Sequence, residues 1–336
     1  MITPQILDPR RPLALSAGAA PLLAVVVDTE EEFNWSAPFD RDATSVEALS
    51  ELYRFQEICT EHGVVPTYVC DWPVVTSGEG ARALGEHLSL GRCEVGAHLH
   101  PWVTPPHVEE VTDHNSYPGN LPPDLEREKL EGLTGAIEEH LGKRPVVYRA
   151  GRYGLGPRTA EALVALGYTV DVSPLAGFDL SKDGGPDWSD LDAAPYSFGP
   201  GGALLGLPAT GGYAGWLAGG GALHRALHGP LPRALRLPGI LSRLGAFERL
   251  ALSPEGFTLA HMQRLTRALF SRGRRVFQLS LHSPSMLPGC TSYARNPQER
   301  DELLARCSGY FRWFREEMGG EVVTASSLPQ RLEASA

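Results

Sequence analysis

Cysteine is scarce in this chain of 336 residues, which contains five. An odd number cannot pair completely, and no two of them have the C-x-x-C spacing of a redox or zinc motif. We therefore expect free thiols and a reducing compartment, and we predict a cytoplasmic location. The five are Cys59, Cys70, Cys93, Cys290 and Cys307.

Positive charge and long apolar runs are also limited. There are 30 Lys and Arg residues against 40 Asp and Glu residues, and this net charge of −10 argues against broad nucleic-acid binding. No stretch reaches the roughly 18 apolar residues of a membrane-spanning helix. The apolar run 12–27 follows Arg10 and Arg11, as in a signal peptide. However, Pro12 and Pro21 interrupt it and acids follow it directly, so a buried strand is the preferred interpretation.

Apolar runs that predict strands alternate with helical patterns through most of the chain. Short runs rich in apolar and β-branched residues predict strands at 22–27, 64–70, 93–98, 145–148, 168–172, 276–281 and 321–324. Apolar residues at helical spacing predict helices at 46–62, 81–90, 125–141, 159–166, 259–272 and 298–318. This alternation predicts parallel βαβ units, and thus an α/β fold. We expect one domain over residues 21–336, preceded by an N-terminal arm of residues 1–20.

Residues 199–256 break this alternation. They are rich in Gly and Pro, and the stretch 223–247 carries four arginines and no acid. The simpler interpretation is an exposed insertion with short amphipathic helices. The alternative is a lid, or a peripheral contact with an anionic surface such as a membrane.

Polar side chains follow the predicted strands, close to where each one ends. They are Asp28, Glu30, Asp71, His98, His100, Arg149, Asp171 and His282. In parallel sheets and barrels the active groups gather at the C-terminal ends of the strands. We therefore expect these side chains to lie together at one end of one sheet.

Two pairs among these side chains have the sequence spacing of metal ligands. His98 and His100 are two residues apart, so both imidazoles face the same side of an extended chain. Histidine with carboxylate is a common catalytic zinc set that leaves one position for water. Asp28 and Glu30 alternate in the same way, and paired carboxylates near a metal can act as ligand and base. The alternatives are two unrelated histidines and a solvated acidic loop.

Three further side chains suit supporting roles. Arg149 ends a strand, and a buried arginine there needs an acid, whose carboxylate a bidentate contact would orient. Arg152 either holds a substrate anion or lies on the surface. His282 closes a late strand and suits a general acid, because imidazole titrates near neutrality.

Five motifs occur in the order found in the polysaccharide deacetylase family with the NodB homology domain, which the chain resembles. They occupy residues 27–31, 96–102, 148–152, 187–188 and 280–283. The nearest resemblance is to the WalW-like subgroup of bacterial proteins, and it covers about residues 20 to 330. It implies a distorted (β/α)7 barrel, similar to a TIM barrel, that removes acetyl groups from sugars with a divalent metal.

The resemblance also implies a role for each matching residue. Asp28 is implied as the base, Arg149 as its tether, His282 as the catalytic acid and Asp187 as the residue that orients it. Glu30, His98 and His100 are implied as ligands of one divalent ion, with zinc expected and Glu31 as the rival to Glu30. The expected substrate-binding residues are Trp102, Arg152, Tyr153 and Trp188.

An acetylated sugar or glycan precursor is the substrate that follows from this resemblance. Two other functions are compatible with the sequence. A glycosidase would use two carboxylates and leave three histidines without a role. A catalytically silent barrel would bind a saccharide or a partner protein. Its best support is that the metal histidines of the family lie four residues apart, whereas Trp102 stands at that distance from His98 in this chain.

Overall fold

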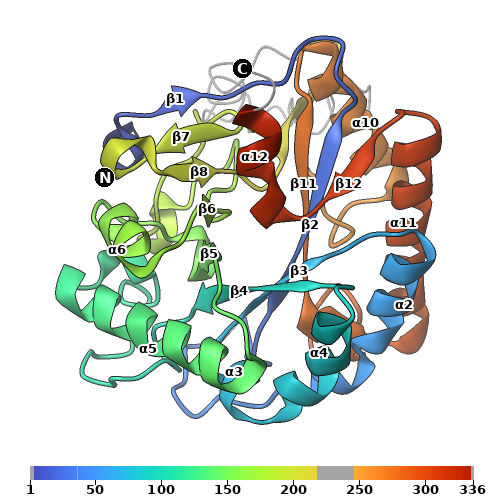
Figure 1. The fold of residues 1–336 in the computed structure, drawn as a ribbon. Coiled ribbons are helices and arrows are strands. Elements are labelled where there is room, and N and C mark those ends of the chain that lie inside the picture. Colours follow the sequence, from blue (N-terminus) through green and yellow to red (C-terminus); the bar gives the residue numbers. More distant parts are fainter. Residues whose placement is uncertain (1–3, 36, 218–245, 334–336) are drawn as a thin grey trace, which may run out of the picture.

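Seven parallel strands form the centre of the computed structural model, which describes residues 4–35, 37–217 and 246–333. In spatial order they are β11 (Val276–His282), β2 (Leu22–Thr29), β3 (Thr67–Cys70), β4 (Glu94–Leu99), β5 (Val147–Ala150), β6 (Val170–Asp171) and β8 (Leu204–Gly206). The sheet curls so that its two ends approach each other (Figure 1). Hydrogen bonds join these ends: Thr210 N–H donates to the Gln278 carbonyl (3.3 Å), Gln278 N–H donates to Thr210 Oγ1 (2.8 Å), and Gln278 Nε2 donates to the Leu207 carbonyl (2.7 Å). The expected distorted α/β barrel is confirmed.

Five further strands extend this sheet or pair beside it. They are β12 (Glu321–Val323), parallel to the start of β2; β7 (Tyr196–Phe198), antiparallel to β8; β1 (Arg11–Pro12), antiparallel to β7; and the antiparallel pair β9 (Gly211–Ala214) and β10 (Glu248–Ala251). The N-terminal arm therefore packs on the barrel through β1, and Ile6 and Leu7 are buried.

The α-helices lie mainly around the outside of the sheet (Figure 1). They are α1 (Pro4–Leu7), α2 (Tyr53–Glu61), α3 (Trp72–Thr76), α4 (Glu79–Ser89), α5 (Pro123–Leu141), α6 (Thr159–Leu166), α10 (Leu259–Ser271), α11 (Pro297–Glu316) and α12 (Leu328–Glu333). Short 3-10 helices are η1 (Glu47–Glu51), η2 (Pro118–Asn120), η3 (Gly151–Tyr153), η4 (Ser181–Asp183), η5 (Pro200–Gly202), η6 (Ser283–Met286) and η7 (Ala325–Ser327). The helix predicted over 46–62 is thus divided into η1 and α2.

Alternation along β2 decides which of its side chains enter the barrel. Leu22, Ala24 and Val26 belong to the inner apolar cluster, whereas the residues between them pack against the helices. Leu328 and Leu332 of α12 join that inner cluster beside the first residues of β2 and β11. The inner face is therefore apolar near the start of β2, and its alternation continues into polar side chains where the strand ends.

The segment 199–256 is not simply an exposed insertion. Residues 204–206 form β8 of the barrel, and 211–214 pair with 248–251. Short, glycine-rich strands with antiparallel partners lack the long apolar runs that mark the other strands, which is why the sequence did not predict them. Residues 218–245 lie outside the described residues, so the amphipathic helices expected within 199–256 and the surface contact expected of 223–247 stay predictions.

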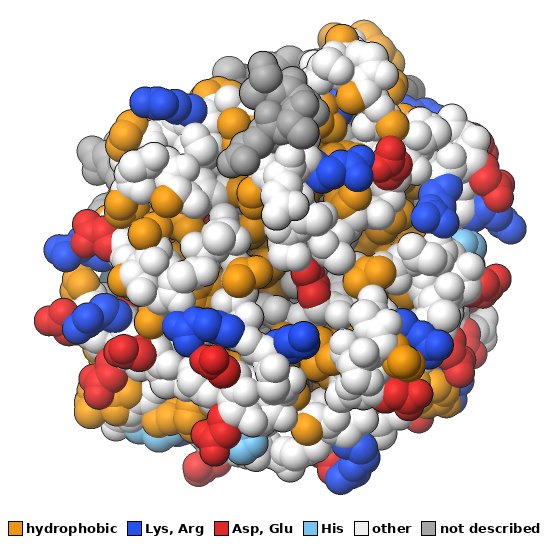
Figure 2. Space-filling model, in the orientation of Figure 1, with side chains coloured by type: hydrophobic (Ala, Val, Ile, Leu, Met, Phe, Trp, Pro, Cys, Tyr) orange, Lys and Arg blue, Asp and Glu red, His pale blue; other side chains and the backbone are white. Residues whose placement is uncertain are grey.

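The face that carries α12 is shown in Figure 2, where Lys and Arg side chains mix with Asp and Glu around the rim. Hydrophobic side chains lie between these charged groups. None of the described helices combines the length and the apolar composition that crossing a bilayer requires.

Candidate active site

Strand register brings the predicted polar residues together at the C-terminal ends of the strands. Asp28 pairs with His282 across β2 and β11, and His98 pairs with Arg149 across β4 and β5. Each of these positions follows the inward alternation of its strand, so the side chains point into the end of the barrel rather than toward the helices. The prediction that these groups share one end of the sheet is confirmed for these four residues.

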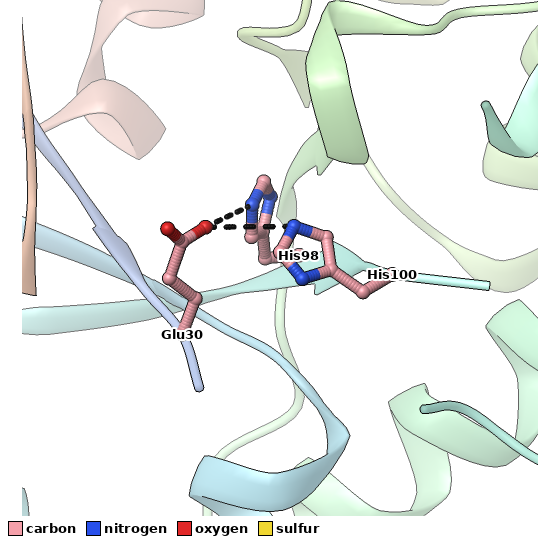
Figure 3. Close-up of side chains that lie close together, drawn as sticks. All are labelled: Glu30, His98 and His100. Carbon is pink, nitrogen blue, oxygen red and sulfur yellow. Dashed lines mark hydrogen bonds and ion pairs between the residues drawn. The ribbon is translucent and has the colours of Figure 1, made fainter. Parts of the chain in front are cut away.

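Glu30, His98 and His100 converge on one point (Figure 3). Glu30 Oε2 lies 3.3 Å from His98 Nε2 and 3.4 Å from His100 Nε2. The three ligand atoms are all within 4.8 Å of one another, and all three side chains are buried. Glu30 Oε1 is buried and has no hydrogen-bond partner among the described residues.

The other ring nitrogens decide which atoms of the two histidines are free to bind. His98 Nδ1 lies 3.1 Å from the Arg149 carbonyl, which can only accept, so Nδ1 carries the hydrogen. His100 Nδ1 lies 2.8 Å from Glu31 Oε2 and donates to the ionised form of this carboxylate. Both Nε2 atoms therefore present a lone pair toward Glu30. Burial lowers the pKa of His98 well below its usual range and that of His100 to about 4, so both rings are neutral.

This donor set fits a divalent cation. Two neutral imidazoles and a carboxylate form a common protein ligand set for zinc, and a hydrogen bond from the far nitrogen of each histidine fixes its orientation. Burial raises the pKa of Glu30 well above its usual range, and the nearby carboxylates add to this rise although the charge of His282 opposes it. A cation at this point would stabilise the ionised form.

Glu31 lies on the far side of His100 and supports it. It accepts hydrogen bonds from Trp102 Nε1 and His100 Nδ1, both at 2.8 Å. Asp71, the N-cap of α3, accepts from the Glu31 backbone N–H at 2.8 Å. Burial raises the pKa of Glu31 to about 8. Glu31 does not line the cavity that Glu30 lines, but with Asp71 and His100 it forms a second buried group whose ligand atoms lie within 4.8 Å of one another.

Arg149 holds Asp28 from within the barrel. Its Nε lies 3.1 Å from Asp28 Oδ1 and its Nη1 lies 3.4 Å from Oδ2. Its Nη2 donates to Gln278 and to Ser280 on β11. Since the guanidinium is rigid and fully buried, contacts to three side chains fix the orientation of the Asp28 carboxylate.

His282 lies between two carboxylates. Its Nδ1 is 2.6 Å from Glu255 Oε2, and its Nε2 is 3.5 Å from Asp28 Oδ2. Glu255 Oε1 also accepts from the His282 backbone N–H (3.1 Å) and from the Ser285 hydroxyl. Burial alone would lower the pKa of His282, but the charges of Glu255 and Glu30 outweigh it and raise the pKa to about 10.

A cavity of about 400 Å³ opens above these groups. Its floor includes Asp28, Glu30, His98, His100, Glu255 and His282, and aromatic side chains form much of its wall. The ring of Trp35, which is 44% exposed, stands 4.9 Å from the His282 ring. The volume lies within the roughly 300–1,000 Å³ of small-molecule sites.

Comparison with known proteins places this arrangement in a recognised fold. No protein-family model matches the chain, and no curated protein matches its sequence. A solved structure from Mycobacterium smegmatis, assigned as a polysaccharide deacetylase, is 17% identical with a TM-score of 0.57; the match covers 98% of this chain and 95% of that one. The chain has the polysaccharide deacetylase fold. Puue allantoinase is also similar, with 15% identity, a TM-score of 0.54, and coverage of 95% of this chain and 92% of that one.

Within this deacetylase fold, one of the predicted contacts is replaced. Asp187 was expected to orient His282, but its carboxylate accepts from the Ser189 backbone N–H, and Glu255 takes the contact with His282. The sequence reasoning missed Glu255 because it lies in the irregular segment 199–256. A signal was present: the short strand β10 ends at Ala251 and an acid follows it at position 255, much as acids follow β2.

Three other predicted positions are corrected. Trp102 and Trp188 are fully buried and do not line the cavity. The Trp102 ring stacks on His100 (4.2 Å between ring centroids), and Trp188 Nε1 donates to the Tyr153 carbonyl (3.0 Å). Asp171 hydrogen-bonds Ser173, and the residues that line the cavity do not include it. Arg152 and Tyr153 do line the cavity, as expected for residues that contact a ligand.

Proposed function

We propose that this protein is a metal-dependent hydrolase that removes an acetyl group from a sugar or glycan, and that it belongs to the polysaccharide deacetylase family. One observation carries the proposal: a three-residue ligand set, a tethered carboxylate and a carboxylate-bound histidine border the same cavity. A metal-dependent hydrolase of acetyl amides or esters can use them as the site of its Lewis acid, the base for water and the acid for the leaving group, respectively.

Glu30, His98 and His100 would hold the metal. When bound there, a divalent ion such as Zn²⁺ supplies Lewis-acid chemistry: it polarises the acetyl carbonyl and lowers the pKa of water. Because the far nitrogen of each histidine is engaged by Arg149 O or by Glu31, the ligand geometry is set before the metal arrives.

Asp28 is the general base in this proposal. Arg149 fixes its orientation, and Asp28 Oδ1 has no hydrogen-bond partner among the described residues, although it faces the Arg149 Nε. The carboxylate lines the cavity and can take a proton from the attacking water.

His282 is the proposed general acid. A pKa of about 10 keeps its imidazole protonated at neutral pH, and Glu255 occupies its Nδ1. The remaining Nε2–H can donate to the leaving amine or sugar oxygen, and acetate and the free sugar are the products. Cation binding at Glu30 would lower the pKa of His282 from this value, which favours proton transfer near neutral pH.

The substrate precursor and the cellular location follow as parts of the same proposal. The five cysteines, all unpaired, are compatible with the cytoplasm. In that compartment the substrate would be a soluble or lipid-linked acetylated precursor.

Acetate release from a panel of acetylated sugars tests the function, with and without a chelator. Ring opening of allantoin is measured in parallel, because Puue allantoinase shares the fold and cyclic amides therefore form the alternative substrate class. The protein should release acetate from at least one sugar, lose the activity with the chelator and regain it with Zn²⁺. His100→Ala should lose bound metal, whereas His140→Ala, an exposed histidine in the last turn of α5, should retain it. Acetate release that survives removal of all metal would contradict the proposal.

A further inference from the structure

Arg152 stands in a backbone conformation that few residues adopt. Its φ is +55°, and that of the next residue, Tyr153, is +58°. In this left-handed region the Cβ atom crowds the following carbonyl oxygen, so residues other than Gly, Asn and Asp seldom occupy it. Such strain persists where the surrounding structure enforces it, often at functional sites. Here both side chains face the cavity.

The Arg152 guanidinium is held in place but incompletely bonded. Its Cζ lies 4.1 Å from the Tyr117 ring centroid and 4.9 Å from that of Phe39. Its Nη1 donates to Ser116 Oγ (2.6 Å) and approaches the Asp113 carbonyl (3.4 Å). Its Nε and Nη2 are accessible and have no hydrogen-bond partner in the described part of the chain.

No acid within 4 Å neutralises this cation among the described residues, which distinguishes Arg152 from Arg149. Asp183, an exposed residue of η4, borders the same cavity but forms no ion pair with it. Phe39 touches Trp102, with 4.5 Å between ring centroids, and Trp102 stacks on His100. The free donors therefore line the same cavity as the candidate metal ligands, at a wall separated from His100 by two aromatic rings.

From this geometry we infer that Arg152 selects substrates that carry an anionic group, a carboxylate or a phosphate, on the acetylated sugar. The inference rests on the proposed function, because it assumes that the acetyl group lies at the floor of the cavity. The floor contains three carboxylates, from Asp28, Glu30 and Glu255, so an anion needs a cation on its own side. A guanidinium whose plane is fixed between two rings offers two adjacent donors in the geometry that carboxylate and phosphate oxygens accept.

Binding of four matched sugars to the purified protein tests this inference. The neutral probe is N-acetylglucosamine. The anionic probes are N-acetylglucosaminuronic acid and the 6-phosphate and 1-phosphate of N-acetylglucosamine. Calorimetry should show at least one anionic sugar binding about tenfold or more tightly than the neutral sugar, the effect expected of one charge-assisted contact. If the carboxylate probe binds most tightly, the anionic group of the substrate is a carboxylate. If a phosphate probe binds most tightly, that group is a phosphate.

Two variants remove the guanidinium. Arg152→Gln keeps much of the side-chain length. Arg152→Asn introduces a residue that tolerates positive φ, so the backbone conformation at this position is retained. Both should reduce the preference for the anionic sugar about tenfold or more, whereas Arg158→Gln, an exposed arginine paired with Glu161, should retain it. Equal binding of neutral and anionic sugars by the parent, or an unchanged preference in both Arg152 variants, would overturn the inference.

Failure of this inference and failure of the proposed function can be told apart. Arg152-dependent binding of anionic sugars without any acetate release would leave the inference standing and remove the deacetylase proposal. Metal-dependent acetate release in which Arg152 does not influence the choice of sugar would support the deacetylase proposal and overturn the inference about Arg152.

Discussion

Replacing Glu255 with glutamine removes the negative charge beside His282 while preserving the shape of the side chain. In the parent, Glu255 Oε2 lies 2.6 Å from His282 Nδ1, and the pKa of His282 is about 10. A hydrogen bond to a charged group contributes about 1.5–3 kcal/mol, and one pKa unit corresponds to about 1.4 kcal/mol. The Glu255→Gln variant should therefore lower the pKa of His282 by about 1 to 2 units.

NMR titration of the His282 imidazole in metal-stripped protein measures this shift directly. In the active enzyme, the alkaline limb of the kcat profile should move to lower pH, because the proton donor is lost at lower pH. The matched control is Glu126→Gln, which changes another buried acid, on α5, whose hydrogen bond is to Thr159. An unchanged His282 titration in Glu255→Gln would refute the assignment of Glu255 as its partner.

Three further variants separate the roles of the site and of the buried acids. His282→Ala should keep its metal content and lose about 10²- to 10⁴-fold in kcat, as expected for a missing general acid; loss of metal measured by elemental analysis would move His282 into the ligand set. Arg149→Lys should retain metal, because the backbone carbonyl of residue 149 still holds His98, but should lose about 10²-fold in kcat as the carboxylate of Asp28 loses its orientation. Burial raises the pKa of Glu126 to about 7, so the folded state binds more protons than the unfolded state and stability falls as pH rises from about 4.5 to 7. Glu126→Gln should remove that cost of about 3 kcal/mol at pH 8 and give little gain at pH 4.5, as measured by urea unfolding.

The elements with strong apolar periodicity could be predicted from the sequence, and those without it could not. Runs rich in apolar residues located β2 and β11, and helical spacing closed by glycine located α5 and α6. The short strands β7 to β10 escaped prediction because they contain few residues, several of them glycine, and pair antiparallel near the end of the sheet. Their pairing partners, rather than their local pattern, determine that they are strands.

Most of the site followed from one physical rule, the alternation of side chains along strands that end at the same edge. That rule joins Asp28, Glu30 and His98, and it extends to His100 just past the end of β4. It fails where the chain has already left the strand. After Pro101 the backbone turns, so Trp102 packs behind His100 and bonds Glu31 instead of facing a ligand. Glu255 was not assigned, because β10 lacks a long apolar run and the contact with His282 depends on the tertiary fold.

The division of labour between Asp28 and Glu30 is the central claim, and one paired measurement tests it most directly. Zn²⁺ is titrated into metal-stripped parent, Asp28→Asn, Glu30→Gln and, as a control, Asp124→Asn, an exposed acid in the first turn of α5. Acetate release is measured on the same samples. Asp28→Asn should bind Zn²⁺ like the parent and release no acetate, whereas Glu30→Gln should lose both properties and Asp124→Asn neither. Loss of Zn²⁺ binding in Asp28→Asn with retention in Glu30→Gln would contradict the account.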